Sequence, residues 1–283
     1  HLILSSNMKI SIPELKPLLK EIAEVAYNVW AHGWAERNAG NISMNVTPHI
    51  RTMDYISDKK QEQHRLPFLF PNLSEQILLM SATGSRMREL AEFPHKYMML
   101  LRISSDGDSY SIIPLANHSF HLQPSSELLA HLAIHQQLIE EDSLNNTLLH
   151  THITEVIALN HFPNLNEKNA LNKVLLSMHP ETILFLPEGA GFVPFLPPGS
   201  QELARKTLDE IKHHSVVIWE KHGVLSYGTS PANACDQLEL IAKAARIYLM
   251  CRQASVSPSG LSIQQLRQLK EKNDLPPHLP FTS

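Results

Sequence analysis

The stretch that decides the fold is Asn146-Thr147-Leu148-Leu149-His150-Thr151-His152, an apolar run that ends in two histidines separated by one residue. Side chains on a strand alternate between its two faces, so His150 and His152 point the same way if this run is a strand. Two imidazoles on one face can each give a nitrogen to one divalent ion, and zinc commonly takes such ligands. Helical signals begin at Thr154. The pair therefore lies at a strand end, a usual place for ligand sites in α/β proteins.

A third histidine has a similar setting. His222 follows the apolar run at 215–219 and precedes Gly223. Three neutral imidazoles leave a fourth zinc position open, which is the arrangement of a catalytic rather than a structural zinc site. Taken alone, His150 and His152 are about as consistent with simple hydrogen bonding at a strand end, and His222 alone favours that interpretation.

The composition is that of a globular protein without a nucleic-acid-binding face. Of the 283 residues, 43% are hydrophobic and 18% are charged, and the net charge is −4 with no block of Lys or Arg. These values argue against disorder and against nucleic-acid binding. No apolar run approaches the roughly 18 residues that a membrane span needs. Cys235 and Cys251 are the only cysteines and cannot build a disulfide framework, so we expect a reducing, cytoplasmic compartment.

Helical and strand patterns interleave along the chain. Helices are expected at 13–36, 86–90, 126–140, from 154 onward, and at 167–178, 200–213 and 231–251; strands are expected at 42–46, 76–80, 97–103, 109–114, 146–152, 182–186 and 216–219. Asp106-Gly107-Asp108 joins two of these strands into a predicted hairpin. The pattern predicts a single layered α/β domain with a central mixed, largely antiparallel β-sheet flanked by helices.

Three segments fall outside this pattern. Residues 1–7 precede Met8 without a targeting signature, so we expect a start-site remnant outside the fold. Residues 47–74 are rich in charge and proline, and we expect them to cover or frame the site. The domain itself is expected to span 8–272, followed by a peripheral tail at 273–283.

Other polar residues lie at the ends of predicted elements. Glu127 stands at the expected start of the 126–140 helix, where the helix N-terminus stabilises a carboxylate that could act as a general base or a fourth metal ligand. The turns at 38–41 and 83–86 contain glycine, which lets the backbone approach an anion, and Ser125 and Ser126 could add hydroxyls. Each feature alone is more often an ordinary cap or turn. Neither turn has a Walker or Rossmann pattern, so nucleotide binding is not indicated.

For the remaining histidines a structural or neighbouring role is the simpler interpretation. His131 and His135 are four residues apart on a predicted helix and could share a metal, but their apolar neighbours favour packing. His118 and His121 lie near Glu127 in the sequence and are candidates for its surroundings.

Five motifs, in order and at similar spacing, resemble the class II, zinc-dependent sugar-phosphate aldolase family, and within it the rhamnulose-1-phosphate aldolases. The motifs are Trp30-Ala31-His32-Gly33-Trp34-Ala35-Glu36-Arg37-Asn38-Ala39-Gly40-Asn41, Thr83-Gly84-Ser85, Pro124-Ser125-Ser126-Glu127, His150-Thr151-His152 and Lys221-His222-Gly223-Val224. The resemblance covers most of residues 13–252, and the ordered set is far more specific than any single motif. The related fuculose-phosphate aldolases and pentulose-phosphate epimerases are shorter and lack so long a segment between the Gly40-Asn41 and Thr83-Gly84-Ser85 motifs.

This resemblance implies a lyase that splits L-rhamnulose 1-phosphate into dihydroxyacetone phosphate and L-lactaldehyde through a metal-stabilised enediolate, with one Zn²⁺ per subunit. It implies that His150, His152 and His222 ligate the metal. It also implies that Glu127 ligates the metal in the resting enzyme and handles protons on the ketone fragment.

The resemblance extends to the substrate pocket and to the assembly. Residues expected to line the phosphate and enediolate pocket are Asn38, Gly40, Asn41, Gly84, Ser85 and Ser126. Glu181 is expected to reach the aldehyde end from a neighbouring subunit of a cyclic homotetramer with interfacial active sites. A small sugar phosphate is thus the expected partner, without nucleic acid or membrane. One departure is Ala39, which stands where these aldolases tend to have glycine and would strain the loop if that position needs a positive φ.

Two alternatives stay open. An aldolase, 4-epimerase or dehydratase of the same superfamily that acts on another phosphorylated ketose, such as L-fuculose 1-phosphate, would share the histidines and the metal-enediolate step. A non-catalytic scaffold of the adducin type would share the fold without the metal histidines, and the presence of all three with Glu127 speaks against it. Lysine Schiff-base chemistry is not indicated, because no lysine occupies a motif setting.

Overall fold

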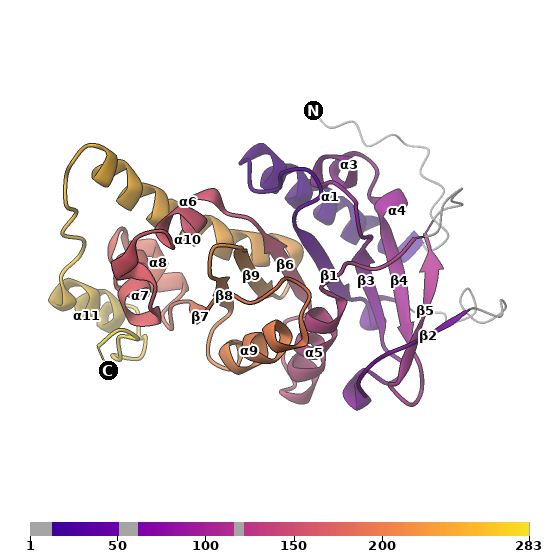
Figure 1. Ribbon diagram of the computed structural model, residues 1–283. Coiled ribbons are helices and arrows are strands. Elements are labelled where there is room, and N and C mark those ends of the chain that lie inside the picture. The colour runs from indigo at the N-terminus through magenta and orange to yellow at the C-terminus, as the bar shows by residue number, and fades with distance from the viewer. Residues whose placement is uncertain (1–12, 51–61, 116–121, 283) are drawn as a thin grey trace.

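The computed structural model describes residues 13–50, 62–115 and 122–282, which form a nine-stranded sheet with helices on both faces (Figure 1). The strands are β1 (Asn41–Asn45), β2 (Gln63–Arg65), β3 (Ile77–Ser81), β4 (Met98–Ile103), β5 (Ser109–Pro114), β6 (Thr147–Thr151), β7 (Gly191–Val193), β8 (Val216–Trp219) and β9 (Gly223–Gly228). The helices are α1 (Lys16–Ala31), α3 (Met87–Glu92), α4 (Pro94–Tyr97), α5 (Leu128–Glu140), α6 (Thr154–Leu159), α7 (Lys168–Ser177), α8 (Pro180–Phe185), α9 (Gln201–Ile211), α10 (Pro231–Gln253) and α11 (Ile263–Lys272), with 3₁₀ turns at Pro13–Leu15, Thr47–His49, Pro71–Leu73 and Pro163–Leu165.

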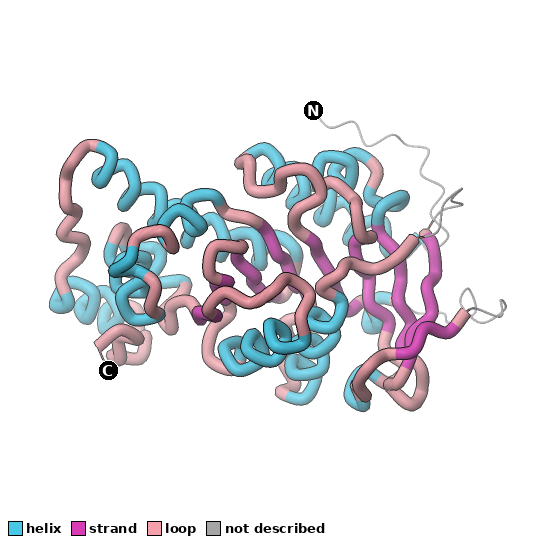
Figure 2. The backbone as a smooth tube through the Cα atoms, in the orientation of Figure 1, coloured by secondary structure: helices cyan, strands magenta, loops and turns pink. Residues whose placement is uncertain are grey.

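The strands form one band through the middle of the molecule, with helices around it (Figure 2). Their order is β2-β5-β4-β3-β1-β6-β9-β8-β7, and every neighbouring pair is antiparallel except β7 with β8. The predicted mixed, largely antiparallel sheet flanked by helices is therefore confirmed. Among the described residues, no helix has the length and apolar character needed to cross a lipid bilayer.

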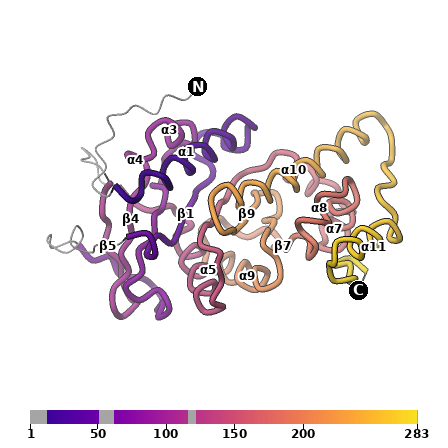
Figure 3. The backbone as a smooth tube through the Cα atoms, turned by 180° about the vertical axis from the view of Figure 1, so that it is seen from behind, coloured from indigo at the N-terminus to yellow at the C-terminus, as the bar shows by residue number. Residues whose placement is uncertain are grey.

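Two pairs of helices cover the two faces of the sheet. On one face α1 packs beside α10, which contacts β6 and β9, and both helices lie over the sheet when the molecule is seen from behind (Figure 3). On the other face α5 packs beside α9, which contacts β7 and β8. The helices α7, α8 and α11 extend beyond β7 at one end of the molecule (Figure 1).

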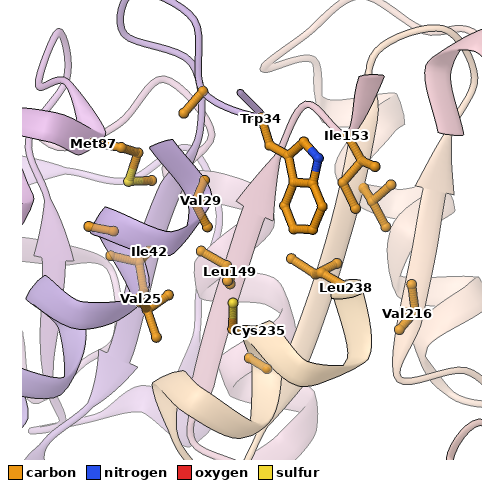
Figure 4. Packing of buried hydrophobic residues seen from close by; sticks show 14 of the residues in the cluster. Val25, Val29, Trp34, Ile42, Met87, Leu149, Ile153, Val216, Cys235 and Leu238 are labelled. Carbon is orange, nitrogen blue, oxygen red and sulfur yellow. The ribbon is translucent and has the colours of Figure 1, made fainter. Parts of the chain in front are cut away.

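The alternating side chains of strand β6 pack against the helices on both faces of the sheet and set the direction of His150. Leu149 packs in the same cluster as Leu238 of α10 (Figure 4), whereas Leu148 packs with Ile134 of α5. Each such fully buried side chain contributes roughly 1.5–3 kcal/mol, so a slip in register by one residue is strongly disfavoured. His150, two residues after Leu148, therefore points to the α5 face.

One predicted strand is wrong. Within the segment 182–186, residues 182–185 belong to helix α8 and Leu186 is its C-terminal cap. An apolar run of this length fits a buried strand or a buried helix equally well, and Pro180 at the first helical turn decides for the helix. The prediction also missed β7, β9 and the edge strand β2.

The C-terminal tail and the segment 47–74 differ from their predicted positions where the structure describes them. The tail is not peripheral: Leu279 is buried in a cluster with Leu266 of α11, and the ammonium of Lys270 donates to the carbonyl of His278. The part of the 47–74 segment around Gln63–Arg65 pairs with β5 at the far edge of the sheet, and none of its described residues lines the pocket of the site. Residues 1–7, with the start-site prediction, lie outside the described residues, as do His118 and His121.

Candidate metal centre

Strand pairing brings the three predicted metal histidines to one end of the sheet. β1 and β6 pair antiparallel with Asn41 opposite His150, and β9 pairs with the other edge of β6, with Val224 opposite Thr151. His222 lies in the tight turn between β8 and β9, closed by a hydrogen bond from its backbone N–H to the carbonyl of Trp219. The chain thus returns beside the end of β6 after about seventy residues.

The imidazoles of His150, His152 and His222 converge. One ring nitrogen from each lies within 4.8 Å of the corresponding atoms of the other two. The ring centroids are 5.0 to 5.2 Å apart in all three pairs. Trp219 closes the back of the cluster, with its ring 4.5 Å from that of His150 and 5.2 Å from that of His222. The three histidines therefore form one cluster and do not lie in separate parts of the structure.

Hydrogen bonds on the outer nitrogens leave the inner ones available. His150 Nδ1 lies 3.0 Å from the carbonyl oxygen of Val224, and because a carbonyl can only accept, Nδ1 carries the proton. The opposite nitrogen, His150 Nε2, is buried without a hydrogen-bond partner among the described residues. His152 Nδ1 lies 2.8 Å from Glu36 Oε1, which fixes that ring in the same way. Metal-binding histidines are commonly oriented by such outer partners.

Burial keeps two of the three rings neutral. Burial lowers the pKa of His150 to about 3. Burial, followed by the nearby His150, lowers the pKa of His222 to about 4. Both rings are thus neutral at pH 7, as ligation requires. A carboxylate completes the centre, since Glu127 Oε1 lies 3.8 Å from His150 Nε2 and 3.9 Å from His222 Nε2.

Gly223 makes this convergence sterically feasible. A Cβ at this position would lie 2.5 Å from the carbonyl oxygen of Thr151, 2.8 Å from His150 Cε1 and 3.0 Å from His152 Cδ2. Only glycine lets the β8–β9 turn approach so closely. The unpartnered buried nitrogen, the neutral rings and the adjacent carboxylate together fit a divalent cation that prefers nitrogen ligands, such as zinc.

A pocket of about 430 Å³ opens over this centre, a volume suited to a small metabolite. Its lining consists of Glu36, Arg37, Asn38, Ala39, Gly40, Asn41, Ala82, Thr83, Gly84, Ser125, Ser126, Glu127, His150, His152, Pro198 and His222. All but one of the expected pocket residues are among these. The exception is Ser85, whose hydroxyl donates to the carbonyl of Ala82 at 2.6 Å.

Sequence reasoning missed other lining residues, of which Arg37 and Pro198 matter most. Arg37 carries the only permanent positive charge among the described residues that line the pocket, and it stands within the same motif as Asn38. Pro198 comes from the loop before α9. This loop can pack closely against Ser126 because position 199 is glycine; a Cβ there would lie 3.0 Å from the carbonyl oxygen of Ser126. No local pattern links that loop to the site.

The concern over Ala39 is resolved by the backbone. Gly40, not Ala39, has the positive φ, at +82°, while Ala39 is not among the residues with positive φ. The glycine is also needed for space, since a Cβ there would lie 3.0 Å from the carbonyl oxygen of His150. Alanine at position 39 therefore introduces no left-handed strain.

Two expected site residues have unexpected partners. The side-chain amide of Asn41 is fully engaged within the protein: its Nδ2 donates to Glu127 Oε2 at 2.7 Å, and its Oδ1 lies 2.6 Å from His131 Nε2. Glu181 does not line the pocket of its own chain. It stands in the first turn of α8, exposed, with its carboxylate 2.8 Å from His179 Nδ1.

Comparisons with known proteins show the family to which the chain belongs. The family model for the class II aldolase and adducin N-terminal domain matches residues 20–249. A rhamnulose-1-phosphate aldolase of Bacteroides thetaiotaomicron is 37% identical over 268 residues, which cover 93% of this chain and 97% of that protein. Another, from Listeria welshimeri, is 30% identical over 246 residues, 87% of this chain and 86% of that protein. The crystal structure of a sugar-phosphate aldolase from Thermotoga maritima superimposes with a TM-score of 0.72 at 32% identity, over 87% of this chain and 99% of that one.

Proposed function

The chain belongs to the class II aldolase and adducin family, and from this we propose that it is a lyase that cleaves L-rhamnulose 1-phosphate to dihydroxyacetone phosphate and L-lactaldehyde. The observation that carries the proposal is the convergence of three imidazoles beside Glu127 in one pocket, in a chain 37% identical to a rhamnulose-1-phosphate aldolase. A scaffold without catalysis has no use for a buried, unpartnered histidine nitrogen, which is a destabilising feature on its own.

His150, His152 and His222 would hold the cation, which we propose to be one Zn²⁺ per subunit. When bound, the ion supplies Lewis acidity that stabilises negative charge on the ketose oxygens. The protein holds two of the three proposed ligand rings from behind, through the carbonyl of Val224 for His150 and the carboxylate of Glu36 for His152. This fixes the rings before substrate arrives, which reduces the reorganisation that binding requires.

The proton transfers are assigned to two carboxylates. As the C3–C4 bond of the ketose breaks, a base must take the proton of the C4 hydroxyl, and C3 of the ketone fragment must then take up a proton. Glu127, with Oε2 held by Asn41 and Oε1 on the side of the histidines, is proposed to handle the proton at C3. Glu181 is proposed to act at the aldehyde end from a neighbouring subunit of a homotetramer with interfacial sites, consistent with its exposed position outside its own chain's pocket.

The phosphate is proposed to bind at the wall of the pocket built from the turn at 38–41, from Thr83 and Gly84, and from Ser126. The positive φ of Gly84, at +75°, permits the tight turn there, and backbone amides can then face an anion. Arg37 lines the same pocket and adds a full positive charge, which strengthens hydrogen bonds to phosphate. Both cysteines are free, which fits the proposed cytoplasmic location.

A substrate comparison tests the proposal. The purified protein is expected to release dihydroxyacetone phosphate from L-rhamnulose 1-phosphate with a kcat/KM at least about tenfold above that for L-fuculose 1-phosphate, a margin of about 1.4 kcal/mol. A chelator should abolish cleavage and added Zn²⁺ restore it, whereas borohydride with substrate should leave the enzyme active. Faster cleavage of the fuculose ester would instead favour the alternative ketose, and a lysine adduct trapped by borohydride would refute the metal assignment.

A further inference from the structure

A buried ladder of hydrogen bonds runs from the pocket into the protein, and none of the roles assigned above uses its inner members. It joins Glu127, Asn41, His131, Ser43 and His135 in that order, and each of these side chains is at most 7% exposed. We propose that His131, Ser43 and His135 are positioning residues that fix the Glu127 carboxylate through Asn41. The inference rests on the proposed function, in which Glu127 handles a proton.

The ladder arises because a helix and a strand have matching repeats. Glu127, His131 and His135 are four residues apart, so they share one face of α5 and its N-terminal cap at intervals of about 6 Å. Asn41 and Ser43 are two residues apart on one face of β1, at an interval of about 6.7 Å. The near equality of these intervals lets each strand side chain lie between two helix side chains.

Four hydrogen bonds connect the members. Asn41 Nδ2 donates to Glu127 Oε2 at 2.7 Å, and Asn41 Oδ1 lies 2.6 Å from His131 Nε2. Ser43 Oγ lies 2.6 Å from His131 Nδ1 and 2.8 Å from His135 Nε2. Both nitrogens of His131 are therefore engaged, in contrast to the free nitrogen of His150.

The carboxylate fixes the direction of every bond. An ionised Glu127 can only accept, so the Asn41 amide must present its N–H₂ to it and its oxygen to His131. His131 then carries its proton on Nε2 and accepts at Nδ1 from the Ser43 hydroxyl. The Ser43 oxygen in turn accepts from His135 Nε2–H. All four donors point toward Glu127, and bonds aligned in this way polarise one another.

The consequence for the site is a carboxylate with one oxygen held and one oxygen available. Oε2 of Glu127 is fixed by Asn41, which leaves Oε1 on the side of His150 and His222. Without the Ser43 hydroxyl, His131 loses the donor that fixes its proton on Nε2, and the orientation of the Asn41 amide is then no longer set from the interior side. The carboxylate would then lose its fixed orientation while the atoms that contact substrate stay in place.

The first test removes the middle of the ladder. Ser43→Ala is expected to lower kcat about 10- to 100-fold, the usual range for an outer partner of a site residue, with KM within about threefold of the parent value. The matched control is Ser226→Ala, which removes another fully buried strand hydroxyl whose bond, to the carbonyl of Ala234 at 2.8 Å, lies outside the ladder. An unchanged kcat in Ser43→Ala, an equal loss in Ser226→Ala, or a loss that follows the metal content would each overturn the proposal.

The second test separates the donor from the volume of a side chain. Gln can place an N–H₂ near the position of His135 Nε2, whereas Leu has a similar size and no donor. His135→Gln is expected to keep kcat within about threefold of the parent, and His135→Leu to lose at least about tenfold. Equal losses in the two variants would reduce His135 to a packing residue and contradict the proposal.

A spectroscopic test needs no substrate and so separates this inference from the proposed reaction. In ¹⁵N-histidine NMR of the metal-free and metal-loaded protein, His131 and His135 are both expected to be neutral with the proton on Nε2, and Ser43→Ala should change the resonances of both. A proton on Nδ1 of either ring overturns the ladder. If these signatures hold but L-rhamnulose 1-phosphate is not cleaved, the proposed substrate fails and the kinetic tests are repeated with the phosphorylated ketose that the parent protein does cleave.

Discussion

Two histidine clusters on the same face of the sheet differ in how their nitrogens are used. In the pocket, His150, His152 and His222 come from two distant parts of the chain, and each offers one nitrogen to a common point. Inside, His131 and His135 are neighbours on one turn of α5, and their hydrogen bonds run to Ser43 and Asn41. Burial lowers the pKa of His131 to about 4 and of His135 to about 3, so these two rings are neutral at pH 7, as are those of His150 and His222.

The difference teaches that a metal centre is recognised by unpartnered nitrogens rather than by spacing. Two histidines four residues apart on a helix are as good a metal motif as two histidines two residues apart on a strand. What excludes His131 as a ligand is that both of its nitrogens already have partners, whereas His150 Nε2 has none among the described residues. The variants below act on one cluster and leave the other as a reference.

The largest effect is expected when a pocket histidine is removed. His150→Ala should reduce bound zinc from about one per chain to almost none, and it should lower kcat/KM by more than the roughly 100-fold upper range for outer partners. Metal analysis of the purified protein and initial rates measure both. The interior reference is His135→Leu, which should keep its metal; loss of metal from that variant instead would mean that the clusters had been assigned the wrong way round.

Gly223→Ala is expected to disturb the pocket cluster without touching a ligand atom. The added Cβ meets Thr151, His150 and His152 at 3.0 Å or less, so the rings or the β8–β9 turn must shift. We expect zinc affinity to fall by tens of fold, measured by competition with a chelator. Gly33→Ala is the control, because a Cβ there meets nothing within 4 Å although φ is +75°; it should lose roughly 1 kcal/mol of stability and keep its zinc affinity. Parental affinity in Gly223→Ala would mean that the close approach is not required.

Local patterns predicted the parts of this fold that depend on local chemistry. The run at 146–152 became β6 because its alternation serves both layers, and the hairpin of β4 and β5 followed from its turn residues. Where tertiary contacts determine the secondary structure, the prediction from sequence failed. The apolar residues of α8 suit either element, and β9 is a strand because it lies between β6 and β8, although its own sequence begins and ends with glycine.

The residues of the site likewise fall into those that local sequence predicts and those that only tertiary packing reveals. The sequence singled out the three clustered histidines and Glu127 because each stands in a short motif at the end of an element. The ladder behind Glu127 was not found, since its register between α5 and β1 is a property of two packed elements, and the apolar neighbours of His131 and His135 made packing the favoured interpretation. The spacing of Glu127, His131 and His135 at intervals of four was the one available signal.

A smaller effect is expected from the outer partner of His152. Glu36→Ala removes the acceptor of the His152 Nδ1 proton, and because Glu36 is 68% exposed we expect zinc affinity to fall about tenfold, the low end of the range for such partners. Glu36→Gln keeps an acceptor oxygen without the charge and should lose less. Competition with a chelator measures both, and equal losses in the two variants would show that charge rather than the hydrogen bond holds the ring.

The smallest effect at neutral pH concerns the interior pair and appears only in acid. The folded pKa of His135, lowered to about 3 by burial, lies below the unfolded value of about 6.5, so this group leaves stability intact above pH 6.5 and reduces it as pH falls from 6.5 toward 3. At pH 5.5 one such histidine costs about 1.4 kcal/mol relative to pH 8. His135→Leu should therefore lose about 1.4 kcal/mol less between these pH values than the parent, measured by urea unfolding with chelator present so that metal release does not contribute. His135→Gln removes the same titrating group and should show the same reduction although it keeps the ladder's donor, which separates the acid response of the interior cluster from its role in positioning Glu127.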